Sequence, residues 1–263
     1  MRRLFSLAVL ALFVGMSSTA FGQIVYDNKS TITNPNAFGI VTDPGAGAGG
    51  FDASVLMTPD TTFGVGHGSG NRLADNFTVP AGFNWTITGA HVIGYTTGAA
   101  APGTTAGVMR ILDGSPAIPT SNVLAGDTST NRLQAGSNQF LNIYRTLTTD
   151  IATATTRRIQ DNILNLGAPV VLGPGTYWFE YGLTGNAFVP PLQVVPRVGG
   201  AVTGDATQFL VASNTYAPVL DGTAAKGIPF QLIGTAAPVP EPTSLGFLAL
   251  GAMSLIARRS RKI

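Results

Sequence analysis

The sequence predicts an all-β protein, an antiparallel β-sandwich or jelly-roll-like single domain, over residues 23–234. Short runs of β-branched and aromatic residues alternate with clusters of Gly, Pro, Asn and Asp, which is typical of strands joined by turns. Helical periodicity is almost absent, which argues against a parallel sheet with alternating helices. The chain has no cysteine, so a packed core rather than disulfides must hold the domain together.

The first 22 residues have the pattern of a signal peptide and are set apart from the domain. Arg2 and Arg3 precede an apolar run at 4–16, and small residues stand at Ala20 and Gly22. Cleavage after Ala20 is an alternative, and a membrane anchor is disfavoured because the run is short. We expect export by the Sec machinery, with signal peptidase as a processing partner.

The clearest pair of strands lies in the stretch NRLADNFTVPAGFNWTITGAHVIGY. We expect strands at 73–79 and 84–95, because Pro80 and Gly82 between them favour a tight turn. In the second strand, alternation places five residues on one face: Trp85, Ile87, Gly89, His91 and Ile93.

Further strands are expected where short apolar runs are bounded by turn residues. They cover residues 108–112, 139–146, 175–183, 192–195, 208–211 and 229–233. Residues 150–169 are expected to connect the sheets, with one short strand at 156–159. Residues 235–238 are expected to form a linker to the end of the chain.

The stretch PGTYWFEYGL is the strongest single strand candidate. Alternation places Tyr177, Phe179 and Tyr181 on one face, which we expect to be core, and Trp178 and Glu180 on the other. An exposed flat ring can stack on a sugar, so Trp178 is the candidate glycan contact.

The charge of the chain lies mostly at its ends. The whole chain carries +2, but residues 23–240 contain nine Lys and Arg against 12 Asp and Glu, a net charge of −3. Nucleic-acid binding depends on a basic patch that neutralises phosphates. The sequence therefore argues against a nucleic-acid partner.

Neither histidine predicts catalysis. His67 lies in GVGHGSGNR, where the serine stands one position too late for a G-x-S-x-G nucleophile elbow, so we expect a loop histidine. His91 is expected to be a half-buried strand residue with a hydrogen-bond partner. Two histidines at no recognised spacing do not predict a zinc site.

Seven carboxylates could include an acid and base pair for glycoside hydrolysis, which needs two carboxyl groups about 5–10 Å apart. They are Asp75, Asp113, Asp127, Asp150, Asp161, Glu180 and Asp205. Most stand near Gly, Asn or Ser, where aspartate commonly caps a turn, and we favour that structural role. We expect no catalytic residue, no metal site and no cofactor. Structural Ca²⁺ between loops is the weak exception, because the D-x-[DN]-x-[DN]-G loop is absent.

The chain ends in VPEPTSLGFLALGAMSLIARRSRKI, residues 239–263. The motif Val239, Pro240, Glu241 and Pro242 precedes an expected transmembrane segment at 243–257. Its apolar run, 245–257, would cover about 20 Å as a helix, against a hydrocarbon core of about 30 Å. A basic tip follows at 258–263, with four cationic residues: Arg258, Arg259, Arg261 and Lys262. This order predicts a marginal membrane segment with a cytoplasmic basic end.

These three parts resemble the bacterial PEP-CTERM sorting signal. The resemblance implies recognition by an exosortase, a membrane-embedded cysteine protease, and cleavage near the motif. It also implies a transient membrane anchor in the precursor and a final location at the cell surface or outside the cell. The two prolines keep the motif extended and accessible to a protease.

Five stretches of the body resemble uncharacterised secreted bacterial β-sandwich proteins. They are LADNFTVPAGFNWTITG, VMRILDGSPAIPTSNVLAGDTSTNRL, NIYRTL, PGTYWFEYGLTG and GIPFQLIG. We expect a non-enzymatic surface or biofilm-matrix protein, with a structural role or an association with extracellular polysaccharide. The alternative is a secreted glycan-active hydrolase that uses paired carboxylates.

Overall fold

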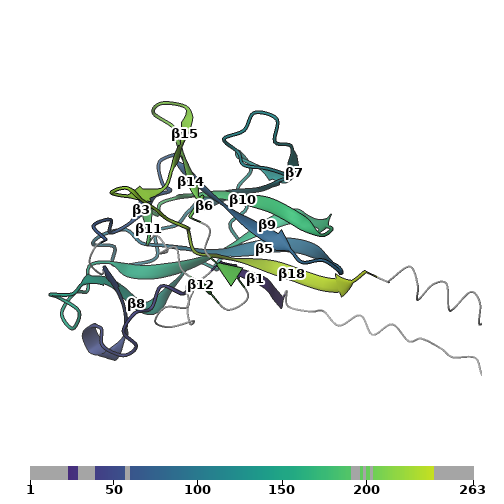
Figure 1. Cartoon of the computed structure of the whole chain (residues 1–263). Helices are drawn as coiled ribbons and strands as arrows, with labels where there is room; N and C mark the ends of the chain where they lie inside the picture. Colours follow the sequence, from purple (N-terminus) through teal and green to yellow (C-terminus); the bar gives the residue numbers. More distant parts are fainter. Residues whose placement is uncertain are drawn as a thin grey trace, which may run out of the picture.

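The computed structural model describes residues 23–28, 39–56, 60–190, 196–197, 200–201 and 204–239. Two six-stranded sheets form a sandwich (Figure 1). The first contains, in order, β1 (Gln23–Asn28), β18 (Phe230–Pro238), β5 (Phe83–Gly94), β9 (Arg158–Leu172), β8 (Gln139–Leu147) and β2 (Asp52–Leu56). The second contains β15 (Thr215–Pro218), β14 (Thr207–Leu210), β4 (Arg72–Val79), β10 (Gly175–Thr184), β6 (Ala106–Leu112) and β7 (Val123–Asp127). The all-β sandwich prediction is confirmed.

Short elements complete the described fold. They are a 3₁₀ turn, η2 (Ala48–Gly50), and three two-stranded ribbons: β3 (Val65–Gly66) with β11 (Phe188–Val189), β12 (Pro196–Arg197) with β13 (Gly200–Ala201), and β16 (Leu220–Asp221) with β17 (Ala224–Ala225). Strand pairing is antiparallel except at the edge of the first sheet, where β2 runs parallel to β8. The expected strand at 192–195 lies outside the described residues.

The core lies between the two sheets and is rich in aromatic rings. Phe179 of β10 meets Phe230 of β18, with ring centroids 4.9 Å apart. Phe77 of β4 stacks on Trp85 of β5 at 6.4 Å. Both contacts join one sheet to the other, so the inward faces of β4, β5, β10 and β18 hold the layers together.

A β-bulge at Thr88 interrupts the alternation that we expected along β5. Ile87 pairs with Gly234 and Gly89 with Ile233, so Thr88 is the extra residue. Because one extra residue exchanges the two faces of a strand, the core side changes after the bulge. Trp85 and Ile87 lie in the core before it, whereas His91 points away from the core after it.

The prediction that residues 150–169 only connect the sheets is wrong for the second half of this segment. Strand β9 is 15 residues long and pairs with both β5 and β8. Its alternation is obscured because Gln160 and Asn162 are polar yet buried. The Asn162 amide donates to the Val92 carbonyl oxygen at 3.2 Å, which allows a polar side chain inside the sandwich.

A buried carboxylate also connects the two layers. Asp75 of β4 faces inward and is 1% exposed. Its Oδ2 accepts hydrogen bonds from Asn28 Nδ2 at 2.8 Å and from the Ile228 backbone N–H at 3.0 Å. The same Asn28 Nδ2 donates to the Ile228 carbonyl oxygen at 2.7 Å. These contacts fix β1 and the residues before β18 against β4.

The chain enters and leaves the sandwich at the same end. Gln23, the first residue of β1, pairs with Gly234 of β18. Strand β18 continues to Pro238, which pairs with Phe83, so the expected linker at 235–238 is part of the sheet. The reason is that β5 extends far enough to pair with these residues (Figure 1). The expected signal peptide, 1–22, lies outside the described residues.

We predict that Trp85→Ala lowers the free energy of unfolding by about 3–5 kcal/mol, because it removes a core indole that is 6% exposed. Val171→Ala on neighbouring β9 is the control, since Val171 is 65% exposed. Its effect should stay within about 0.5 kcal/mol. Urea unfolding of both variants measures the difference, and equal effects would contradict the assigned core.

Candidate functional site

The predicted sorting motif follows β18 without a spacer. Val239, its first residue, donates its backbone N–H to the Gly82 carbonyl oxygen at 2.8 Å. This bond ties the exit of the chain to the turn between β4 and β5. Pro240, Glu241 and Pro242 lie outside the described residues, as do the segment at 243–257 and the four cationic residues of the tip, Arg258, Arg259, Arg261 and Lys262. Among the residues that are described, no helix has the length and apolar character needed to cross a membrane.

The face assignment of β10 is confirmed, but the expected exposure of Trp178 is wrong. Phe179 and Tyr181 are fully buried in the main core. Trp178 points to the opposite face, yet it is only 9% exposed and packs with Ala74 and Leu112. A glycan contact at Trp178 stays a prediction, and the structure leaves little of its ring free for stacking.

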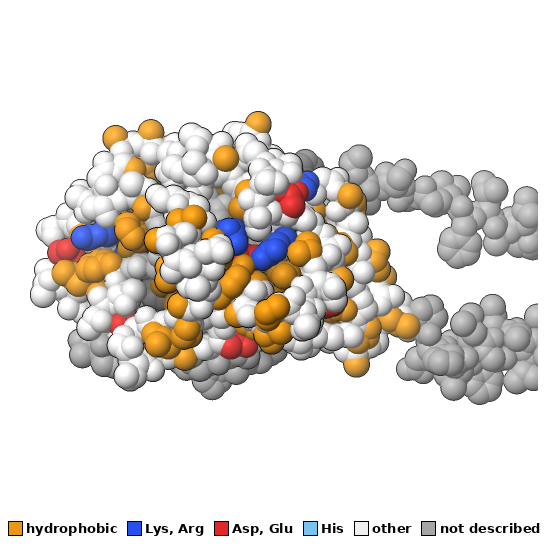
Figure 2. Space-filling view, turned by 90° about the horizontal axis from the view of Figure 1, so that it is seen from above, with side chains coloured by type: hydrophobic (Ala, Val, Ile, Leu, Met, Phe, Trp, Pro, Cys, Tyr) orange, Lys and Arg blue, Asp and Glu red, His pale blue; other side chains and the backbone are white. Residues whose placement is uncertain are grey.

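Glu180 lies on the same outer face and is held by cations. Its carboxylate accepts hydrogen bonds from Arg72 Nε at 2.9 Å, from Arg110 Nε and from the Tyr216 hydroxyl at 2.8 Å. The Arg72 guanidinium also stacks on the Phe209 ring, 3.9 Å from its centroid. Figure 2 looks on to this side and shows basic side chains near the middle, with hydrophobic ones around them. Charge pairing of this kind stabilises the strand order β14-β4-β10-β6.

His67 is a loop residue, as expected, but it is completely buried. Its Nε2 lies 2.9 Å from Asn186 Oδ1. Its ring packs against that of Tyr181 in a T-shaped arrangement, with the ring centroids 5.6 Å apart. Burial lowers the pKa of His67 to about 4, so the imidazole is neutral near pH 7. Gly94 makes room for it, because a Cβ there would lie 2.7 Å from the ring.

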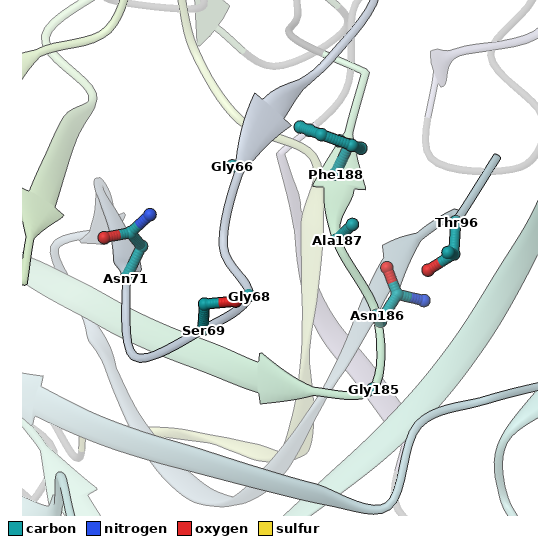
Figure 3. A pocket seen from close by; sticks show the side chains of 9 residues that line it. All are labelled: Gly66, Gly68, Ser69, Asn71, Thr96, Gly185, Asn186, Ala187 and Phe188. Atoms are coloured by element: carbon teal, nitrogen blue, oxygen red, sulfur yellow. The ribbon is translucent and has the colours of Figure 1, made fainter.

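A cleft of about 420 Å³ lies beside His67, between the end of β5 and the segment after β10. Figure 3 shows Asn71 and Ser69 on one side, with Asn186 and Thr96 on the other. The Phe188 ring, 40% exposed, lies at the edge of the cleft. The lining contains amides, hydroxyls and one aromatic ring but no charged side chain. Such a surface suits a neutral, hydroxyl-rich ligand.

Sequence reasoning missed this cleft because its residues come from distant segments. The glycines around His67 were the available signal, since close backbone approach commonly requires Gly. Ser69 adopts a left-handed backbone conformation, with φ of 56°, where the chain turns into β4. Asn186 carries no such signal, and only the fold brings it to His67.

The seven candidate carboxylates hold the fold in different ways. Asp113, Asp127 and Asp150 accept backbone N–H bonds within their own loops, as the turn-capping interpretation predicts. Asp161 pairs with His91 Nδ1 at 2.9 Å, which confirms the half-buried strand histidine with a partner. Asp205 accepts a hydrogen bond from the side chain of Asn76. Among the described residues, no three His, Cys, Asp or Glu side chains gather closely enough to hold a metal ion.

The burial of Arg145 was not predicted from the sequence. Arg145 is 6% exposed, and it donates from Nε to the Phe63 carbonyl oxygen at 2.9 Å and from Nη2 to that of Thr62 at 3.3 Å. Burial lowers the pKa of Arg145 to about 10. Nearby, Asp221 accepts the backbone N–H of Thr61 at 3.0 Å. The Arg145 bonds fasten the loop before β3 to the first sheet, and the Asp221 bond fastens it to β16.

Two opposite pKa shifts lead to a prediction about pH. Burial raises the pKa of Asp75 to about 7. Protonated Asp75 therefore contributes to the unfolding free energy at low pH, and this contribution is lost as pH rises from about 4 to about 7. Burial lowers the pKa of His67 to about 4. Neutral His67 therefore contributes to the unfolding free energy at higher pH, and this contribution is lost as pH falls from about 6.5 to about 4. Between about pH 4.5 and 6.5 the two effects oppose each other. We expect the unfolding free energy to change little there.

Single variants should reveal each effect. In Asp75→Asn, the unfolding free energy should fall by about 2–3 kcal/mol as pH falls from 6.5 to 4.5, because the opposing contribution of Asp75 is removed and that of His67 remains. In His67→Gln, the unfolding free energy should rise by a similar amount as pH falls from 6.5 to 4.5, because the contribution of Asp75 remains. Urea unfolding at several pH values in this range measures both slopes. Slopes of the same sign in the two variants would refute the assignment.

A family model for the PEP-CTERM protein-sorting motif matches residues 238–262. No curated protein matches the chain. The matched segment begins at Pro238, the last residue of β18, and includes all four residues of the predicted motif. The match supports export of the chain and its processing by an exosortase. It also implies that the C-terminal tail anchors the protein in the membrane before cleavage.

Proposed function

We propose that this exosortase substrate acts without catalysis at the cell surface, where its β-sandwich associates with extracellular polysaccharide of the biofilm matrix. The observation that carries the proposal is the sorting motif at the end of β18. Because the last strand of the first sheet leads directly into the motif, recognition of the motif holds the folded body at the outer side of the membrane.

The position of the cleft supports this role. The cleft lies where β5 and β10 end, whereas the chain leaves beside the start of β5. The 12 residues of β5 separate the two places by roughly 35 Å. The cleft therefore lies at the end of the sandwich opposite the anchored tail, where a matrix polymer can reach it.

The chemistry of the cleft supports a neutral polysaccharide. Asn71 and Ser69 supply amide and hydroxyl groups, and Phe188 supplies a ring on which a sugar can stack. The body carries a net charge of −3, which disfavours anionic polymers. These features fit association through stacking and hydrogen bonds.

The environments of the carboxylates favour binding over hydrolysis. A glycosidase of the usual kind needs two carboxyl groups that face a common sugar site. Here Glu180 is held by two arginines and a tyrosine, and Asp75 lies between the sheets. The cleft lining includes neither of them.

A sorting prediction follows from the C-terminal match. Replacing the four cationic residues of the tip by Gln should leave synthesis intact but impair membrane retention and processing, because the cytoplasmic charge is lost. The control is Arg157→Gln, which changes a basic residue of the body. Blots of cell fractions with an antibody to the body report mass and location. Identical processing of the tip variant and its parent would refute the sorting role.

Binding is tested with two phenylalanines of nearly equal exposure. Phe188→Ala at the cleft should weaken binding to a neutral polysaccharide roughly 2–10-fold, because it removes a stacking surface. Phe83→Ala is the matched control, since Phe83 is 41% exposed at the opposite end and Phe188 is 40% exposed. Affinity electrophoresis in dextran, galactomannan and alginate compares neutral with anionic polymers. Equal mobility of all three proteins in every gel would refute the polysaccharide role.

A further inference from the structure

The end of the sandwich at which the chain leaves is built from short turns and strand ends. The turn at 80–82 joins β4 to β5, and Gly173 and Pro174 join β9 to β10. The first residues of β1 and the last residues of β18 lie at the same end. The connection at 113–122 between β6 and β7 also belongs to it, because Leu112 pairs with Trp178 near the start of β10. We call this surface the exit end.

The exit end is almost free of charge. Its strand ends and turns contain no Lys, Arg, Asp or Glu: residues 23–25, 79–86, 170–176 and 235–239. The connection at 113–122 contains one charged residue, Asp113. The carboxylate of Asp113 already accepts the Asn122 backbone N–H and Nδ2, both at 2.7 Å. Among the described residues of this surface, Asp113 is therefore the one charged side chain that would lose water against lipid.

Several large apolar side chains are exposed on the same surface. Phe83 is 41% exposed, Val171 65%, Ile24 38%, Ile118 53% and Val239 37%. They come from both sheets and from both termini of the domain. Figure 2 shows hydrophobic side chains on the right-hand side of the described domain. Phenylalanine and aliphatic residues of this kind partition into the membrane interface.

The tail is too short to hold this surface far from the membrane. Val239 is fixed to the turn at 80–82, and the apolar run begins at Leu245. The chain between these residues extends at most roughly 20 Å. A headgroup layer is roughly 5–8 Å thick, so an anchored tail keeps the exit end within reach of the bilayer.

We propose that the nearly uncharged exit end rests on the lipid surface of the membrane in which the tail is anchored, with Phe83 and Val171 in the interface. The inference rests on the membrane anchoring that forms part of the proposed function. The occupant is lipid rather than a folded partner, because the contacting side chains are scattered and apolar and lack the polar pattern of a protein interface. The contact would orient the body with the cleft pointing outward.

The absence of cysteine gives a direct test on the full-length chain. Ala81→Cys in the turn at 80–82 and Thr155→Cys at the opposite end each receive one environment-sensitive fluorophore. Both proteins are reconstituted in phosphatidylcholine vesicles that contain a brominated lipid quencher. We expect at least several-fold stronger quenching at residue 81 than at residue 155. Adding phosphatidylglycerol should change the quenching little, because the contact is apolar.

A second pair of variants tests the apolar side chains themselves. Val171→Asp, combined with Ala81→Cys, should reduce the quenching, and Val211→Asp should not, since Val211 is 52% exposed but lies after β14. Circular dichroism of each variant verifies the fold. If the protein co-sediments with vesicles while residues 81 and 155 are quenched equally, the inference is wrong and the anchoring stands. If the chain does not co-sediment, the anchoring itself fails. Protection of residue 81 only after an exosortase is added would assign the surface to the protease and overturn the lipid contact.

Discussion

The position of β18 inside the first sheet is the constraint on which the rest of the structure depends. It pairs with β1 on one side and β5 on the other, so the sheet is incomplete until nearly the whole chain has been exported. The segment just before it carries Ile228, which binds Asn28 and Asp75. Because Pro238 still belongs to the sheet and also begins the sorting match, completion of the fold and presentation of the motif involve the same residues.

Buried polar clusters do in this chain what disulfides do in many exported domains. Asp75 and Asn28 bridge the two sheets. Glu180 joins Arg72 and Arg110 across three strands. Arg145 fastens a loop by donating hydrogen bonds to carbonyl oxygens of that loop. Each buried polar or charged group costs free energy to remove from water and is tolerated because hydrogen bonds satisfy it. Removing one partner would leave the other unsatisfied, so these clusters specify one arrangement of the strands as well as stabilising it.

The two ends of the sandwich have different chemistry. The exit end carries apolar side chains and short turns, whereas the cleft end carries amides, hydroxyls and the buried histidine. Strand β5 runs from one end to the other, because it begins beside Val239 and ends beside Asn186. One long strand thus links the place where the chain is anchored to the place best suited to meet a ligand.

The sequence by itself determined the fold class, most strand positions and the C-terminal signal, because alternation, turn residues and a three-part motif are local patterns. The core face of β10 was also predictable, since Phe179 and Tyr181 alternate with Trp178. Tertiary structure decided the rest. The bulge at Thr88 reversed the faces of β5, and packing against Ala74 and Leu112 buried Trp178. Pairing on two sides made residues 158–172 a strand, although Gln160 and Asn162 obscure its alternation. The cleft required His67 and Asn186, which lie 119 residues apart, to meet. Contacts between distant residues leave no periodic trace in the sequence, so only the folded chain reveals them.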